Sequence, residues 1–160
     1  KNKMTEKLFE LAYTDSMTEV QNRNAYEECL KKLRKPNANI SRITVVVVDV
    51  NGLKEINDSY GHFCGDDAIK TVAKALRDTI GLKADIYRIG GDEFVCISES
   101  NVLPYISQFK DTIYFINNEK LYNLSVSIGY SRFHEKYSKS IDDIICRADE
   151  KMYKDKKSKK

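Results

Sequence analysis

The stretch ADIYRIGGDEFVCIS (residues 84–98) decides the fold, because it contains two strand-like apolar runs separated by a pair of glycines. Two such runs around a tight turn predict a β-hairpin. Helical patterns lie on both sides of this hairpin, so the sequence predicts an α+β fold in which helices cover a mainly antiparallel sheet, and not a doubly wound parallel fold. Glycine pairs weaken strands and adjacent carboxylates repel each other, so the run Gly90–Glu93 needs a reason to exist.

Apolar periodicity predicts the other elements. ITVVVVDV (43–50) is a continuous β-branched run, which predicts a central strand covered on both faces. Helical spacing predicts helices over 23–33, 65–80 and 102–116, and residues 121–131 are predicted to contain a strand. Ser140 and Asp143 match a capping box ahead of a last helix over 141–153.

Length, charge and cysteines bound the class of protein. The 160 residues suit one domain, and 27 basic against 24 acidic residues do not indicate a nucleic-acid partner. No apolar run approaches the ~20 residues of a membrane span, so no membrane contact is predicted for this domain. The four dispersed cysteines favour free thiols in a reducing cytoplasm over zinc or disulfides. Residues 1–12 are predicted to be a helical linker cut from a longer protein, and residues 13–160 the domain itself.

Acidic residues gather where two predicted strands meet. Asp49 ends the valine strand, and the hairpin turn can bring Asp92 and Glu93 alongside it. Converging carboxylates need a counterion, and Mg²⁺ held by one or two carboxylates plus phosphates is a usual solution. Glycines allow close approach of a ligand to the backbone and also positive φ angles. The hairpin therefore favours a nucleotide platform with a metal clamp, and the alternative is an ordinary glycine turn with solvated acids.

A second polar segment strengthens the first interpretation. DVNGLKEINDSYGHFCGDD (49–67) places six polar residues between a strand and a helix: Asp49, Lys54, Asn57, Asp58, His62 and Asp66. Each has a plainer alternative as a turn former, a helix N-cap or a solvated side chain. Their occurrence together, beside a second acidic segment, favours a functional site.

Five motifs in order resemble the GGDEF family of diguanylate cyclases. Residues 90–94 match the signature letter for letter, and DVNGLKEINDSYGHFCGD (49–66) is similar to the family's D-x-D-x-F-K-x-x-N-D-x-x-G-H-x-x-G-D. DSMTEVQNRNAY (15–26), SVSIGYS (125–131) and RADEKMYKDKK (147–157) look like its opening motif and its two C-terminal elements. The resemblance spans residues 13–157.

The resemblance implies a palm-like fold close to the class III nucleotide cyclases, with a central, mainly antiparallel sheet flanked by helices. It implies that two GTP condense to cyclic di-GMP and two pyrophosphates in a homodimer that carries one GTP per subunit. It also implies a sensory or regulatory domain in the parent protein, which is cytoplasmic or anchored in a membrane.

The resemblance assigns metal and catalytic roles by position. Asp49, the carbonyl of Val50 and Asp92 would hold Mg²⁺ or Mn²⁺. Asp92 would also take the proton from the attacking 3′-hydroxyl, with Glu93 in support, and Lys54 would stabilise charge on the phosphates. The remaining implied residues contact the substrate: Asn57 and Asp66 would read guanine, His62 would line the same pocket, Gly90 and Gly91 would admit the nucleotide, and Lys156 and Lys160 would hold the terminal phosphates.

Several positions depart from the family pattern. Asn51 and Leu53 stand where many members have Asp and Phe, and Glu19 replaces a glycine of the opening motif, which is expected to alter a turn. The G-R-N that usually follows the last motif is absent. An R-x-x-D product site five residues before the glycines is absent too, since its ends are Gly81 and Ala84.

Two other functions compete with an active cyclase. The first is a degenerate module that binds GTP or cyclic di-GMP without turnover, against which the acidic hairpin, Asp49 and Lys54 argue. The second is a purine-promiscuous relative that makes mixed cyclic dinucleotides, against which Asp66 argues, because adenine lacks the N1–H donor that a carboxylate accepts.

Overall fold

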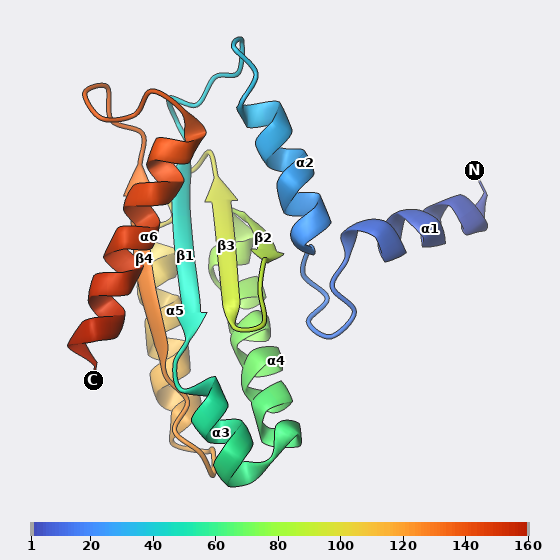
Figure 1. Cartoon of the computed structure of the whole chain (residues 1–160), viewed down its shortest axis with the longest axis vertical. Coiled ribbons are helices and arrows are strands. Elements are labelled where there is room, and N and C mark those ends of the chain that lie inside the picture. The colour runs from blue at the N-terminus through green and yellow to red at the C-terminus, as the bar shows by residue number, and fades with distance from the viewer. Residues whose placement is uncertain (1, 160) are drawn as a thin grey trace.

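The valine run forms the central strand of a four-stranded antiparallel sheet in the computed structural model, which describes residues 2–159. The strands are β1 (Thr44–Val50), β2 (Asp85–Arg88), β3 (Glu93–Ser98) and β4 (Val126–Arg132), in the order β2-β3-β1-β4 (Figure 1). All seven residues of β1 are buried, because helices cover both faces of the sheet. The predicted α+β fold with an antiparallel sheet is confirmed.

Two layers of helices enclose the sheet. One face packs against α4 (His62–Asp78) and α5 (Leu103–Asn117) and the other against α2 (Arg23–Leu33) and α6 (Ile141–Ser158) (Figure 1). The valines of β1 alternate between the two cores, with Val46 and Val48 in the first and Val45 and Val47 in the second. A short helix α3 (Leu53–Tyr60) follows β1, and a 3₁₀ turn η1 (Ile80–Leu82) precedes β2.

The helices and strands predicted by periodicity are present, and so is the capping box of α6. The prediction was wrong in two local features. Residues 53–60 form a separate helix, and α4 begins at His62, because Gly61 breaks the chain between the two helices with a φ of 91°. The link between β2 and β3 is also longer than a two-glycine turn, since it comprises residues 89–92.

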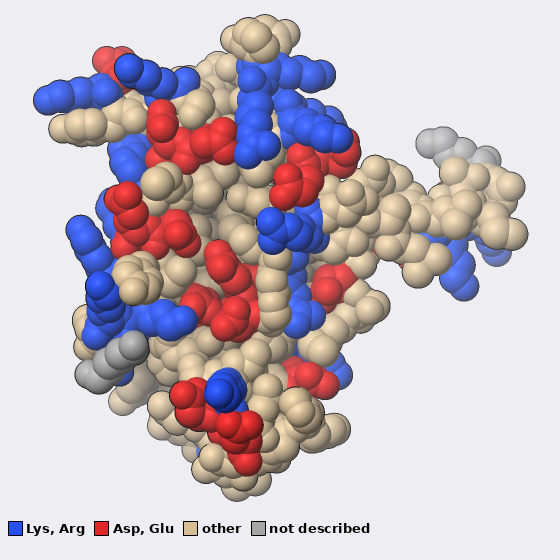
Figure 2. Space-filling model, in the orientation of Figure 1, with Lys and Arg blue, Asp and Glu red and all other residues tan. Residues whose placement is uncertain are grey.

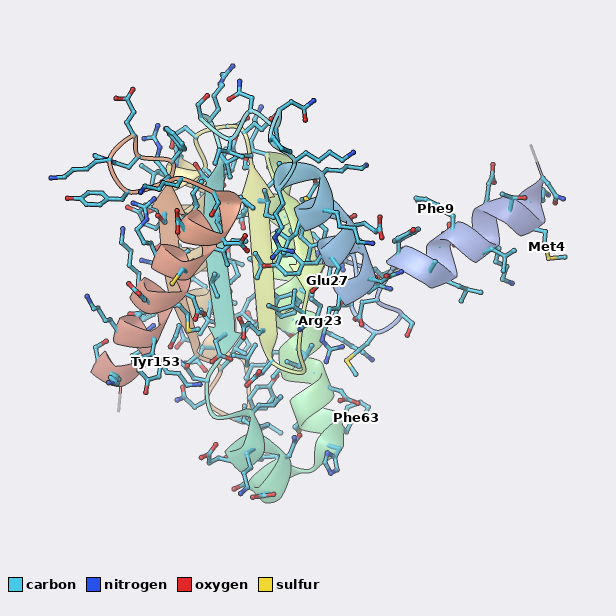
Figure 3. The ribbon with its side chains drawn as sticks, turned by 45° about the horizontal axis from the view of Figure 1, so that its top comes forward. Met4, Phe9, Arg23, Glu27, Phe63 and Tyr153 are labelled. Carbon is cyan, nitrogen blue, oxygen red and sulfur yellow. The ribbon has the colours of Figure 1, made fainter. Side chains whose placement is uncertain are left out.

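Helix α1 (Lys3–Tyr13) stands apart from the two layers (Figure 3). None of its residues is buried, and four large apolar side chains on it are at least 60% exposed: Met4, Leu8, Phe9 and Leu11. Within residues 2–159, no helix combines the length and apolar character needed to cross a membrane.

Gly129 lets α6 lie directly on the backbone of β4. A Cβ atom at this position would stand 2.2 Å from the amide nitrogen of Met152 and 2.3 Å from the carbonyl oxygen of Ala148. Any other residue would therefore push the helix off the strand. This contact holds α6 against the sheet, and Lys156 in the last turn of α6 donates to Asp49 near the end of β1.

Glu19 adopts a left-handed conformation, with a φ of 64°, and no other non-glycine residue among 2–159 has a positive φ. It closes a turn in which the amide of Glu19 donates to the Asp15 carbonyl at 2.8 Å. The family's glycine at this position is thereby explained, because an L-residue pays about 1–2 kcal/mol in this region.

We expect Glu19→Gly to raise the free energy of unfolding by roughly 0.5–1 kcal/mol, after allowance for the greater freedom of glycine in the unfolded chain. Urea unfolding measures the change. Glu19→Ala is the control, because it removes the carboxylate but keeps the Cβ atom, and it should give no comparable gain. Equal stability of the Gly and Ala variants would contradict the prediction.

Candidate active site

The acids of the hairpin and of β1 meet because of the strand register. Asp49 lies opposite Glu93 in the β1–β3 ladder, and the amide of Val50 donates to the carbonyl of Asp92 at 2.8 Å. The last two residues of β1 are thus fixed against the first residue of β3 and the turn before it. The predicted convergence of Asp49, Asp92 and Glu93 is present in the structure.

Asp49 is a buried carboxylate that is only half satisfied. It is 6% exposed, and its Oδ2 accepts a hydrogen bond from Lys156 Nζ at 2.7 Å. Its Oδ1 is buried and has no hydrogen-bond partner among residues 2–159. Burial raises the pKa of Asp49, and the charge of Asp92 adds to that effect while Lys156 opposes it. A buried oxygen atom without a partner is costly, so this position favours an added cation.

Two further side chains respond to the same charges. Burial raises the pKa of Glu93, and the carboxylates of Asp149, Asp49 and Asp92 raise it further. The bond to Asp49 raises the pKa of Lys156. The site therefore carries an excess of negative charge that a single lysine only partly offsets.

The residues fit a divalent cation. Among residues 2–159 no three His, Cys, Asp or Glu side chains gather closely enough to hold an ion by themselves. Mg²⁺ in nucleotide sites is commonly held by one or two carboxylates plus substrate phosphates, and Asp49 and Asp92 supply two carboxylates here. The unpaired Oδ1 of Asp49 supplies the hard oxygen ligand that such an ion requires.

Two arginines hold the turn between β2 and β3 by donating hydrogen bonds to its backbone carbonyls. Arg88 Nη2 donates to the Gly91 carbonyl at 2.8 Å, and Arg23 Nη1 donates to the Ile89 carbonyl at 2.7 Å. Figure 3 labels Arg23 on α2. Arg88 also pairs with Asp15 at 3.2 Å, which ties the opening motif to the turn. Sequence reasoning missed both arginines, and the only signal was their place within or beside the motifs.

Gly90 and Gly91 leave open space beside the acids. Neither has a positive φ, so a left-handed backbone conformation does not account for glycine at these positions. A Cβ atom at Gly91 would meet no described atom within 4 Å, and at Gly90 only the Cβ of Glu93, at 3.9 Å. Packing within the chain therefore does not require glycine here, and the backbone at both positions is open to close approach by a ligand.

A pocket of about 670 Å³ opens next to the acids, and it is lined by the end of β1, by α3 and by the last turn of α6. Lys54, Asp92, Lys156 and Lys159 contribute to its wall. Figure 2 shows acidic side chains gathered on this face, with basic side chains at the end of α6 beside them. Positive charge around a pocket with an acidic edge suits a metal-bound polyphosphate.

Asn51 does not act as a second acid at this site. Its Nδ2 donates to Ser125 Oγ at 2.9 Å, and its Oδ1 accepts from Ser127 Oγ at 2.7 Å. The amide thus bridges the end of β1 to β4 with a donor and an acceptor at once, so this departure from the family pattern has a structural role.

The residues expected to read guanine lie where α3 meets α4. The side chain of Asn57 lies against Gly65, where an added Cβ would stand 1.8 Å from its Oδ1. His62 is exposed as the first residue of α4, and Asp66 is exposed beyond its first turn. The N-cap of α4 is Gly61, so the alternative that Asp66 caps this helix is wrong. None of the three lines the pocket just described, and Lys160 lies outside the described residues.

Comparisons with known proteins agree with this geometry. A family model described as "Diguanylate cyclase, GGDEF domain" matches residues 12–160. The chain is 32% identical to the probable diguanylate cyclase DgcI of Escherichia coli K12 over 153 residues, which cover 94% of this chain and 33% of that protein. It is 31% identical to a diguanylate cyclase of Vibrio cholerae over 170 residues, which cover 97% of this chain and 50% of that one. The chain thus spans a third to a half of these relatives.

A solved structure shares the fold. The coiled coil and GGDEF domain of DgcB from Caulobacter crescentus, in complex with c-di-GMP, superposes with a TM-score of 0.80 at 22% identity, covering 97% of this chain and 86% of that one.

Proposed function

Because the chain belongs to the GGDEF family of diguanylate cyclases, we propose that it condenses two GTP into cyclic di-GMP with release of two pyrophosphates. Each subunit of a homodimer would bring one GTP. The observation that carries the proposal is the buried carboxylate of Asp49, with one oxygen unpaired, beside Asp92 and Glu93 at the end of the sheet. Residues 1–12 would link the domain to a regulatory domain of a longer protein, and the reaction would take place in the cytoplasm.

Asp49, the carbonyl of Val50 and Asp92 would hold Mg²⁺ or Mn²⁺. The ion would neutralise charge on the phosphates and on the attacking oxygen, which is the main requirement of phosphoryl-transfer chemistry. Asp92 would accept the proton of the 3′-hydroxyl of one GTP. The 3′-oxygen would then bond to the α-phosphorus of the facing GTP, and pyrophosphate would leave. Lys54 and Lys156, which line the same pocket, would bind the phosphates, and Glu93 would support the ion.

Guanine would be read at the junction of α3 and α4. Asp66 would accept from N1–H and N2–H₂, a pattern that adenine does not present. Asn57 would contact the same base, and His62 would line the base-binding site at this junction. The close packing of Asn57 on Gly65 supports this placement, because it fixes the amide between the two helices.

Incubation with Mg²⁺ and GTP, with ATP, or with both, followed by mass identification of the products, tests the proposal. Cyclic di-GMP from GTP alone is the expected result. Binding of GTP without any product would indicate the degenerate binding module instead, and mixed dinucleotides would indicate a purine-promiscuous enzyme.

Specific activity should rise with protein concentration, because one subunit with one GTP has no second nucleotide to attack. Helix α1 carries exposed apolar side chains, but an 11-residue helix offers only a short interface. Turnover measured across dilutions, with the mass of the species measured at each, checks this. Specific activity that stays constant across the range where the protein is monomeric would contradict it.

Micromolar cyclic di-GMP should not inhibit this domain allosterically. A Cβ atom at Gly81 would stand 2.9 Å from Ile86 Cδ1 and 3.1 Å from the Leu76 carbonyl oxygen, so any larger side chain here would require both neighbours to move. Ala84 has no acceptor, and Lys83 offers a point charge instead of a bidentate fork. Adding product at the start of a turnover assay while varying GTP tests this. Inhibition that saturating GTP cannot relieve would reveal a second product site.

A further inference from the structure

Lys156 pairs with Asp49, the carboxylate that the proposed metal would bind. Its Nζ lies 2.7 Å from Asp49 Oδ2, and in the part of the chain that the structure describes this is the ion pair that Asp49 makes. The carboxylate comes from a buried strand and the ammonium from the last turn of α6, 107 residues further along the chain. The pair therefore neutralises a buried charge through one of the two carboxylate oxygens.

The ammonium and a divalent ion compete for this carboxylate. Mg²⁺ binds carboxylate oxygens at about 2.0–2.1 Å, so an ion on Asp49 would lie close to an ammonium that remained hydrogen-bonded to the same group. Two cations at such a distance in a partly buried site repel each other strongly. Lys156 on Oδ2 would therefore weaken the binding of an ion to the free Oδ1, and the ion would bind more tightly once Lys156 left Asp49.

The side chain of Lys156 also has space to move away from Asp49. Its side chain is 39% exposed and lines the pocket that Lys54 and Asp92 line. Its Cα cannot follow the movement, because Gly129 holds α6 against β4. The exchange is therefore limited to a swing of the side chain, for which a flexible four-carbon stem is well suited.

We propose that Lys156 is an exchangeable counterion, which pairs with Asp49 and transfers to the substrate's phosphates as metal and nucleotide enter together. The inference rests on the proposed function and extends it. Lys156 disfavours binding of the metal alone, and the phosphates remove that obstacle, so the two ligands bind cooperatively. By linkage, the metal strengthens nucleotide binding to the same degree.

The test measures Mn²⁺ affinity by electron paramagnetic resonance, with and without a GTP analogue that carries a methylene group between the α- and β-phosphates. Without nucleotide, Lys156→Gln should bind Mn²⁺ about tenfold more tightly than the unmodified protein. The nucleotide should tighten Mn²⁺ binding far more in the unmodified protein than in the variant. The factor by which the nucleotide raises Mn²⁺ affinity should therefore be at least tenfold smaller in Lys156→Gln than in the unmodified protein.

Lys159→Gln is the matched control. Lys159 lines the same pocket but donates to the Val126 carbonyl and to Asp155, at 2.5 and 3.1 Å, and not to Asp49. It should leave the cooperativity between Mn²⁺ and the analogue unchanged. The double variant Asp49→Asn, Lys156→Gln should lose the gain in Mn²⁺ affinity, which would locate the ion at Asp49.

Equal Mn²⁺ affinity of the unmodified protein and Lys156→Gln, whether tight or undetectable, would overturn the inference. A gain of the same size in Lys159→Gln would also overturn it, because the effect would then be one of general charge. Neither result bears on whether the unmodified protein makes cyclic di-GMP, so failure of the inference is distinct from failure of the proposed function.

Discussion

Asp92→Asn should abolish cyclic di-GMP formation and leave the fold at least as stable as before. The substitution keeps the shape of the side chain but removes a proposed metal ligand and the proposed proton acceptor. Loss of a group behind a metal ligand commonly costs 10- to 100-fold in affinity or activity, so loss of the ligand itself should cost on the order of 10³-fold or more. The carbonyl of Asp92, which pairs with Val50, is untouched.

The expected stability follows from the neighbouring pKa values. Burial is the main cause of the raised pKa of Asp49 and of Glu93, and the charge of Asp92 raises both further. A carboxyl group whose folded pKa is raised destabilises the fold once it ionises, so stability is lost as the pH rises through that pKa. Asp92→Asn should therefore hold or raise the melting temperature at pH 7, and the gain should disappear in acid, where these groups are protonated.

Asp149→Asn is the matched control for Asp92. The exposed Asp149 on α6 also raises the pKa of Glu93, but it belongs to none of the proposed ligands. It should relieve repulsion in the same direction and keep turnover. Product formation measured by mass and thermal unfolding at two pH values distinguish the two variants. Substantial turnover by Asp92→Asn would remove the role assigned to this residue.

Asp66→Ala should weaken discrimination between GTP and ATP. An unpaired guanine edge loses its advantage over adenine, and sites built to hydrogen-bond a substrate lose selectivity by large factors when the partner is removed. We expect the ratio of kcat/KM for GTP over ATP to fall by roughly 10²-fold. Since Asp66 does not cap α4, a loss of fold is not expected to obscure the result.

Asp67→Ala is the neighbouring control. Its carboxylate accepts from Lys120 at 2.8 Å and from the Tyr122 hydroxyl at 2.5 Å, so it ties α4 to the segment before β4. This variant should lose stability and keep the preference for GTP. If Asp66→Ala still rejects ATP as strongly as the unmodified protein, guanine is read by other residues.

Most helices and strands could be predicted from the sequence because the signals for them are local. The valine run, the apolar stripe of α4 and the capping box at Ser140 each lie within one element. Helix α3 was missed because it is only eight residues long (Leu53–Tyr60) and buries a single residue, Ile56. The break at Gly61 depends on a backbone angle that a single glycine does not predict.

The site was predictable where it follows from strand ends, as with Asp49, Asp92 and Glu93. The bond of Lys156 to Asp49 was not, because it depends on where α6 docks against the sheet. The roles of Arg23 and Arg88 behind the turn were hidden for a different reason. Their partners are backbone carbonyls, which every residue has, so no sequence pattern marks them.

Gly129 has a consequence for anyone who builds this domain into a synthetic sensor. The backbones of β4 and α6 are in direct contact at Gly129. The sequence of either element can therefore be replaced by that of a homologue only if the other is replaced with it. Redesign of α6 is confined to its outward face, where Tyr153 is exposed (Figure 3). A fusion partner should be attached where it does not displace α6 along β4, because the contact at Gly129 sets the position of the last turn of the helix.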